Sequence, residues 1–141
     1  MIGPQHREED ASGAWGLYYG LLTGIVREAA GDVTLLGVDV KEFLVLNDVE
    51  ACPYPAPLAE RLAVPRATMT GYLKSLEAKR LIERTIDPTD MRRHRLTLTK
   101  AGRQAVARGR VIFSGVFGRR LERLDPGERA IFHALLEKLH C

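Results

Sequence analysis

The most informative pattern in the chain is a change of hydrophobic period between residues 58 and 99. Residues 58–79 place apolar side chains at helical spacing, in two runs separated by Val64-Pro65. A short apolar segment from Ile82 then enters a turn at Asp87-Pro88, and the alternating segment Arg95–Thr99 leaves it. The pattern predicts two helices joined by a tight turn and followed directly by a β-hairpin.

Helical spacing and capping signals predict four further helices outside this segment. Asp39 with Glu42, and Asp125 with Glu128, have the spacing of a capping box, in which the cap and the third helical residue bond each other's backbone. The predicted helices cover residues 11–30, 39 to about 51, 57–63, 65–79, 100–122 and 126–139. The expected fold class is therefore mainly α with a small β-hairpin.

The first predicted helix carries an unusual glycine repeat. Gly16, Gly20 and Gly24 recur every four residues and so lie along one side of the helix. Each glycine costs about 1 kcal/mol of helix stability relative to alanine. We expect close approach of another helix to offset this cost. The alternative is a weak helix that frays.

The charge of the chain is distributed unevenly. The 141 residues carry a net charge of only +3, which fits one soluble globular domain. The first 50 residues hold three basic and nine acidic side chains, whereas residues 57–99 hold nine basic and five acidic ones. A basic middle segment favours contacts with phosphate groups. An ordinary solvated surface with uneven charge is the alternative.

Several classes of protein find no support in the sequence. No segment approaches the roughly 18 uninterrupted apolar residues of a membrane span, and the polar N-terminus is not a secretory signal, so we expect a cytoplasmic protein. No phosphate-binding loop or catalytic motif is present, so we expect neither an enzyme nor a cofactor. The spacing of His133, His140 and Cys141 is a weak metal signal, and we expect no metal site.

Cys52 is a candidate redox switch. No cationic neighbour in sequence lowers its pKa, and a free cysteine is more often a small buried hydrophobe. We therefore expect Cys52 to be structural.

The longer helix of the pair, over residues 65–79, has the composition of a recognition helix. Such a helix places its N-terminal residues against base edges in the major groove, where arginine reads guanine and threonine reaches a thymine methyl group or a phosphate. Its candidate DNA-binding residues are Arg66, Thr68, Thr70, Gly71 and Lys74. The opposite side should face the core through Met69, Tyr72, Leu73 and Leu76.

The tip of the predicted hairpin is strongly basic. An arginine on such a tip can enter a narrow minor groove, where the negative potential is enhanced. We expect the Asp90 carboxylate to brace the guanidinium of Arg92 through a charge-assisted hydrogen bond. The alternative is a solvated loop whose arginines only aid solubility. The candidate residues of the tip are Asp90, Arg92, Arg93, His94 and Arg95.

These motifs resemble the winged helix–turn–helix of the MarR family of bacterial transcription regulators. The family's wing signature is matched by Asp90-Met91-Arg92, five further residues and Leu98-Thr99, with Gly102 following. The ending LDPGERAIFHALLEKL is similar to the last helix of the family. The resemblance covers nearly the whole chain.

The resemblance implies an architecture and a mode of action. Residues 1–141 would form one MarR-like chain, with dimerisation helices in 11–38 and 100–141 and a winged helix–turn–helix in 39–99. A homodimer would bind a palindromic operator in double-stranded DNA as a repressor, and a small, often aromatic molecule would release it. Trp15, Tyr18 and Tyr19 could line the effector pocket, although aromatic residues at helical spacing are more often dimer core.

Three positions depart from the family's pattern. Pro65 stands where a serine cap is usual, Gly71 where an arginine is common, and Lys74 where an aspartate is common. We therefore expect the base preference to differ from that of typical members. Two other functions remain open: a winged-helix protein-interaction module without specific DNA binding, and a DNA-binding regulator that needs no effector.

Overall fold

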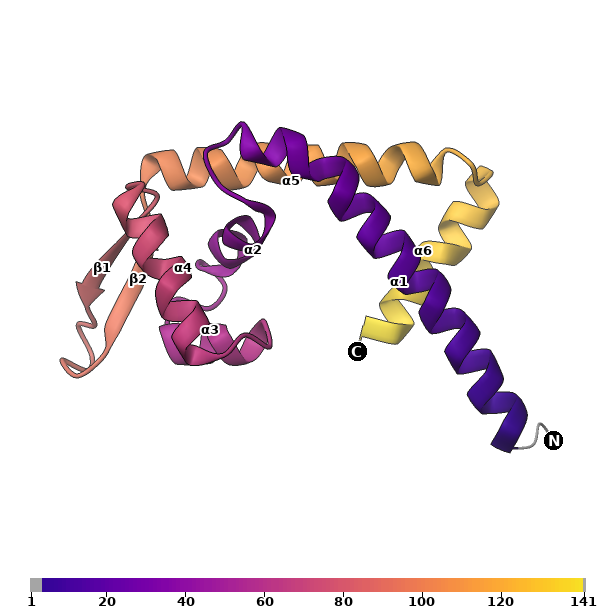
Figure 1. Cartoon of the computed structure of the whole chain (residues 1–141), viewed down its shortest axis with the longest axis horizontal. Coiled ribbons are helices and arrows are strands. Elements are labelled where there is room, and N and C mark those ends of the chain that lie inside the picture. The colour runs from indigo at the N-terminus through magenta and orange to yellow at the C-terminus, as the bar shows by residue number, and fades with distance from the viewer. Residues whose placement is uncertain (1–3, 141) are drawn as a thin grey trace. The chain divides into compact units, whose positions relative to one another are not determined.

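The computed structural model describes residues 4–140, which form six helices and two strands (Figure 1). The fold class predicted from the sequence, mainly helical with one small hairpin, is confirmed. The elements in chain order are α1 (Pro4–Thr34), α2 (Val40–Asp48), α3 (Pro55–Arg61), α4 (Arg66–Ala78), β1 (Ile82–Ile86), β2 (His94–Leu98), α5 (Lys100–Leu121) and α6 (Pro126–His140). Helix α1 extends beyond the predicted residues 11–30 at both ends, and α3 begins at Pro55 rather than at Pro57.

The described chain divides into two compact units. The first unit comprises residues 30–112, and the second unit combines the residues up to Ala29 with those from Phe113 onward. None of the helices within residues 4–140 is both long and apolar enough to cross a membrane.

The core of the 30–112 unit lies beneath α2, α3, α4 and the hairpin. Helix α4 lies beside β1, and α3 lies beside β2 (Figure 1). The largest fully buried side chains in this core include Leu46, Leu58, Met69, Leu73, Leu76, Ile82 and Leu96. Burying each such side chain contributes about 1.5–3 kcal/mol, so this core fixes the helices that carry the candidate site.

Two glycines allow α5 to lie close to this core. A Cβ atom at Gly109 would lie 2.0 Å from the Phe43 ring, and a Cβ atom at Gly102 would lie 2.0 Å from the carbonyl oxygen of Leu81. On α2, Phe43 and Val45 are buried, whereas Leu44 is 45% exposed. The reason is that Val45, rather than Leu44, falls on the face of α2 that meets the core.

The hairpin is antiparallel, and its register pairs Ile82 with Leu98 and Ile86 with His94. Thr99 then begins α5, because its hydroxyl accepts from the Gly102 N–H at 3.0 Å and donates to the Arg80 carbonyl at 2.8 Å. The predicted succession of strand and helix is confirmed, and Thr99 caps the helix.

The second unit presents a largely unburied apolar surface. Helix α6 begins as its capping box predicts: the Glu128 N–H donates to Asp125 Oδ1 at 2.8 Å, and the Asp125 N–H donates to Glu128 Oε2 at 2.9 Å. The large apolar side chains exposed on α1 and α6 in this unit are Trp15, Leu17, Tyr18, Tyr19, Leu22, Ile131, Leu135, Leu136 and Leu139. Apart from the adjacent residues and the nearby backbone of α1 itself, no described atom lies within 4 Å of a Cβ built at Gly16 or Gly20, so the helix expected beside them is not supplied by the same chain.

Candidate nucleic-acid interface

Helix α4 offers a polar face because its apolar face is fixed in the core. Met69, Leu73 and Leu76 are buried, and Tyr72, expected among them, is half-buried. The predicted DNA-binding residues of this helix are all exposed, namely Arg66, Thr68, Thr70, Gly71 and Lys74. Thus the structure brings this predicted set together on one exposed helix.

The start of α4 lacks a side-chain cap. Pro65 is the N-cap residue, with φ −55° and ψ 143°, and its carbonyl accepts from the Met69 N–H at 2.9 Å. Before it, Ala63 takes the left-handed conformation at φ 52°, which turns the chain sharply between α3 and α4. Since proline offers no hydroxyl to the first helical N–H groups, these donors remain available at the end of α4 that carries Arg66 and Thr68.

Glu42 fixes the far half of α4 to α2. Its carboxylate is buried, accepts from the Ser75 hydroxyl at 2.7 Å, and lies 2.8 and 2.9 Å from Lys79 Nζ. It also accepts from the Asp39 N–H at 3.2 Å, which completes the predicted capping box. Burial raises the pKa of Glu42, but the hydrogen bonds from Lys79 and Ser75 outweigh it and leave the pKa below its usual value of 4.5. The sequence pointed to the cap but not to the link with α4.

The hydroxyl of Thr70 is committed to its own helix, where it donates to the Arg66 carbonyl at 2.9 Å. Its oxygen can still accept a hydrogen bond, and its methyl group can contact an apolar group. Arg66 and Lys74 form no ion pair within the described part of the chain. Both positive charges are therefore free to meet an anion.

The loop between β1 and β2 exposes Asp90, Arg92 and Arg93, and the start of β2 exposes His94 and Arg95, as predicted. The expected brace between Asp90 and the Arg92 guanidinium is wrong. Asp90 Oδ1 instead accepts from the backbone N–H of Arg92 at 3.0 Å. The reason is local: an aspartate two residues before an N–H reaches it in an Asx turn. This turn shapes the tip and leaves the Arg92 guanidinium unpaired among the described residues.

The wing base contains a polar cluster that sequence reasoning missed. Asp87 is only 3% exposed and accepts hydrogen bonds from the Tyr54 hydroxyl at 2.6 Å and from the Thr89 hydroxyl at 2.7 Å. The hydrogen bonds from Thr89 and Tyr54 hold the pKa of Asp87 far below its usual range, and the bond to Asp87 raises the pKa of Tyr54. The Arg93 guanidinium lies 3.9 Å from the centre of the Tyr54 ring. Tyr54 stands in a proline-rich connection, which in sequence looks only like a linker.

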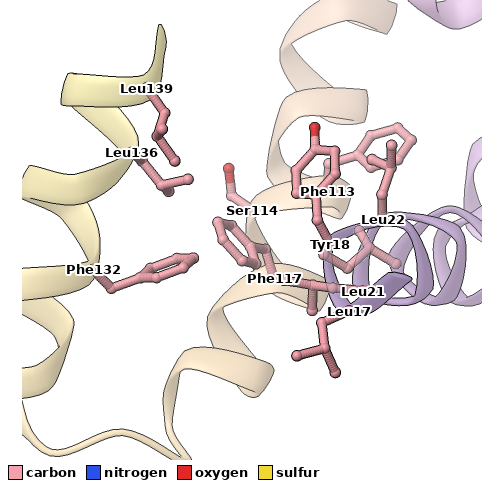
Figure 2. Close-up of a pocket in the computed structure, with 11 residues that line it drawn as sticks. Leu17, Tyr18, Leu21, Leu22, Phe113, Ser114, Phe117, Phe132, Leu136 and Leu139 are labelled. Atoms are coloured by element: carbon pink, nitrogen blue, oxygen red, sulfur yellow. The ribbon is translucent and has the colours of Figure 1, made fainter. Parts of the chain in front are cut away.

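An apolar pocket of about 680 Å³ lies within the second unit (Figure 2). In Figure 2, Phe132, Leu136 and Leu139 of α6 face the side chains of α5 and α1 across this space. The pocket is lined by Leu17, Tyr18, Leu21, Leu22, Ile25, Phe113, Ser114, Phe117, Phe132, Leu136 and Leu139. Of the aromatic residues predicted for an effector pocket, Tyr18 is among the lining residues, whereas Trp15 and Tyr19 are not. Trp15 instead packs against Tyr19, with ring centres 5.9 Å apart.

The comparisons with known proteins agree with this arrangement. Residues 36–93, which contain α2 to the wing tip, match the model of a family described as the MarR family. Known structures that resemble the chain are regulators of the same family. The chain resembles MarR-family proteins in sequence over residues 36–93 and in fold over nearly its whole length.

Three MarR-family structures illustrate the likeness. The reduced form of MarR from Escherichia coli is 22% identical, with a TM-score of 0.77 over 99% of this chain and 98% of that one. The MarR family protein Rv2887 of Mycobacterium tuberculosis, in complex with DNA, is 26% identical, with a TM-score of 0.72 over 89% of this chain and 95% of that one. The same protein in complex with p-aminosalicylic acid gives a TM-score of 0.74 at 26% identity, over 89% and 96% of the two chains. No curated protein sequence matches the chain significantly.

Metal-ligating side chains do not cluster in the part of the chain that the structure describes. Within the described residues, no group of three or more histidine, cysteine or carboxylate side chains could hold an ion. Cys52 is a free, half-buried thiol, and Cys141 lies outside the described residues.

Proposed function

We propose that the chain is a homodimeric, sequence-specific transcriptional repressor that binds a palindromic operator in the cytoplasm and is released by a small aromatic molecule. The MarR-family fold of a DNA-binding transcription regulator is the ground for this proposal. The observation that carries it is the pairing, in one compact unit, of the exposed polar face of α4 with an unpaired arginine at the wing tip.

In this proposal, α4 and the wing divide the work of binding DNA. Helix α4 would enter the major groove, where Arg66 and Thr68 meet base edges and Lys74 meets a phosphate. Arg92 would enter the minor groove, with Arg95 and His94 against the backbone. Arg93 would contribute its charge from beside Tyr54.

The dimer would form through the helices of the second unit. Its exposed leucines and aromatic residues form an apolar surface that a partner chain would bury, and the open glycines of α1 permit a partner helix to approach. A two-fold dimer presents two recognition helices about one turn of DNA apart, which matches a palindromic site.

An effector would act by binding one dimer geometry better than the other. Rv2887, which resembles this chain, has been crystallised with p-aminosalicylic acid and with salicylic acid, which supports an aromatic acid as the first class to try. The shift in DNA binding can be no larger than the effector's differential affinity for the two geometries. A regulator without an effector is the alternative. If no aromatic acid changes the melting temperature or releases DNA, that alternative is favoured.

The central experiment combines a genomic-fragment binding selection with gel filtration. We expect a dimer that enriches a palindromic sequence. A monomer that enriches no sequence would instead favour the protein-interaction module. The uncapped start of α4 and the acidic first 50 residues support this alternative.

Arg92→Ala tests the wing on the selected operator. Because the unpaired guanidinium of Arg92 would lie against DNA, we expect affinity to fall about 5- to 100-fold at roughly 150 mM salt. Arg123→Ala is the matched control, since it removes the same charge from the other unit and should leave affinity nearly unchanged. Equal affinities of Arg92→Ala and wild type would remove the wing from the mechanism.

A further inference from the structure

The wing is bonded along both edges of strand β2. One edge pairs with β1, and on the other the Leu96 N–H donates to the carbonyl of Pro53 at 2.7 Å. Tyr54, the next residue, is the N-cap of α3 and has extended backbone, with φ −126° and ψ 134°. Its side chain makes no cap hydrogen bond to α3. The residue that opens the helix–turn–helix therefore directs its side chain to the wing instead.

The phenol of Tyr54 reaches the start of the wing loop. Its hydroxyl donates to Asp87 Oδ2 at 2.6 Å, while Asp87 Oδ1 accepts from the N–H of Thr89 at 2.8 Å and from its hydroxyl at 2.7 Å. Asp87 is nearly inaccessible to solvent, so its carboxylate depends on these donors in place of water. Removal of the Tyr54 hydroxyl would leave one carboxylate oxygen without its donor.

The ring of Tyr54 reaches the end of the same loop. The Arg93 guanidinium lies 3.9 Å from the ring centre, in the position of a cation–π contact. The backbone closes the loop as well, because the Asp87 N–H donates to the Arg93 carbonyl at 2.9 Å. One side chain thus touches both ends of the loop that carries Arg92. Arg92 itself takes part in neither contact.

We propose that Tyr54 is a positioning residue that holds the wing loop in the conformation that presents Arg92 to DNA. The inference rests on the proposed DNA-binding function but assigns a role to a residue outside the helix and the wing tip. We call the contacts of Tyr54 with Asp87 and Arg93 the Tyr54 latch. A loop ordered in advance loses less conformational entropy when it binds, so the latch strengthens binding without touching DNA. Because Tyr54 also begins α3, the latch fixes the wing to the helix–turn–helix within one unit.

Tyr54→Phe tests the latch because it keeps the ring under Arg93 and removes only the hydroxyl. We expect amide hydrogen exchange over residues 87–95 of the free protein to become about two- to tenfold faster, and that over α4 to stay unchanged. Operator affinity should fall by a similar factor.

A double-mutant cycle with Arg92→Ala separates positioning from direct contact. If Tyr54 acts through the wing, Tyr54→Phe should weaken binding less than about twofold in the Arg92→Ala background. Additive losses would overturn the proposal, because Tyr54 would then contact DNA independently. Unchanged exchange over residues 87–95 would overturn it too. Failure of the wild type to bind any DNA would overturn the proposed function alone, since the exchange experiment needs no DNA and still decides whether Tyr54 orders the wing.

Discussion

At the scale of single residues, two buried carboxylates join separate elements of the 30–112 unit. Glu42 joins the start of α2 to the far half of α4, and Asp87 joins the wing loop to Tyr54. Each carboxylate is nearly inaccessible to solvent and receives several hydrogen bonds. A buried carboxylate of this kind contributes orientation as well as stability, because its partners must keep their positions for the charge to stay satisfied.

Glu42→Gln should destabilise the protein. Glutamine has one acceptor oxygen in place of two, so it cannot serve Asp39, Ser75 and Lys79 together, and we expect a loss of about 1–3 kcal/mol in the free energy of unfolding at pH 7. Urea unfolding at fixed protein concentration measures this loss. Glu50→Gln is the control, since Glu50 is an exposed carboxylate of the same unit and should change stability by less than about 0.5 kcal/mol.

The difference between wild type and Glu42→Gln should depend on pH in one direction. The pKa of Glu42 lies below its usual value of 4.5 in the folded chain, so its contribution is fully present above about pH 5 and is lost as pH falls through the folded pKa. The stability gap should therefore shrink below pH 4.5. Asp87, whose pKa is lowered too, is common to both proteins and cancels in the comparison. A gap that stays constant down to pH 3 would contradict the ionised hydrogen-bonded Glu42.

At the scale of elements, the sequence predicted the order and type of every helix and strand but not how they contact one another. Hydrophobic period, capping boxes and the turn at Asp87-Pro88 are local signals, and the structure confirms the elements they predicted. The contacts of Glu42 with Ser75 and of Tyr54 with Asp87 join residues 33 positions apart, and no local pattern encodes such pairs. The wrong prediction at Asp90 had a local cause. The Asp90 carboxylate accepts from the backbone N–H of Arg92, which is nearer in sequence than the end of the Arg92 side chain, and so does not pair with its guanidinium.

Gly109→Ala should loosen the packing of α5 on α2. The added Cβ would lie 2.0 Å from a ring carbon of Phe43, which is itself buried, so either the ring or the helix must move. Overpacking of this size costs about 1–3 kcal/mol. Gly71→Ala is the control: it adds the same methyl group to an exposed helical glycine with no atom within 4 Å and should stabilise by up to about 1 kcal/mol. Thermal unfolding of both variants at one concentration checks the contrast, and a Gly109→Ala protein as stable as Gly71→Ala would show that the close approach is absent.

At the scale of the whole molecule, the proposed function requires two copies of the chain. Binding to a palindromic operator would engage two recognition helices, and a second copy of the chain would bury the exposed apolar residues of the second unit. The amino-acid composition did not indicate that two copies are needed, because the net charge of the chain is only +3 and combines an acidic first 50 residues with a basic middle segment. The glycine repeat of α1 did indicate it. The repeat lowers helix stability, and a closely packed neighbouring helix would offset this cost, but the described chain provides no such neighbour at Gly16 and Gly20.

Leu17→Glu tests the dimer and its link to DNA binding together. Leu17 is 79% exposed in the chain, so the change should leave the folded protomer intact. Loss of its burial in both copies of a two-fold interface costs about 3–6 kcal/mol, which raises the dimer dissociation constant by at least about 100-fold. Sedimentation velocity measures that change, and Met91→Glu, at an 84% exposed position of the wing, is the matched control that should stay dimeric. Because a monomer engages only one half-site, Leu17→Glu should also lose most of its operator affinity at protein concentrations where it is monomeric. A variant that is monomeric and still binds the full operator as tightly as wild type would show that each wing and recognition helix acts alone.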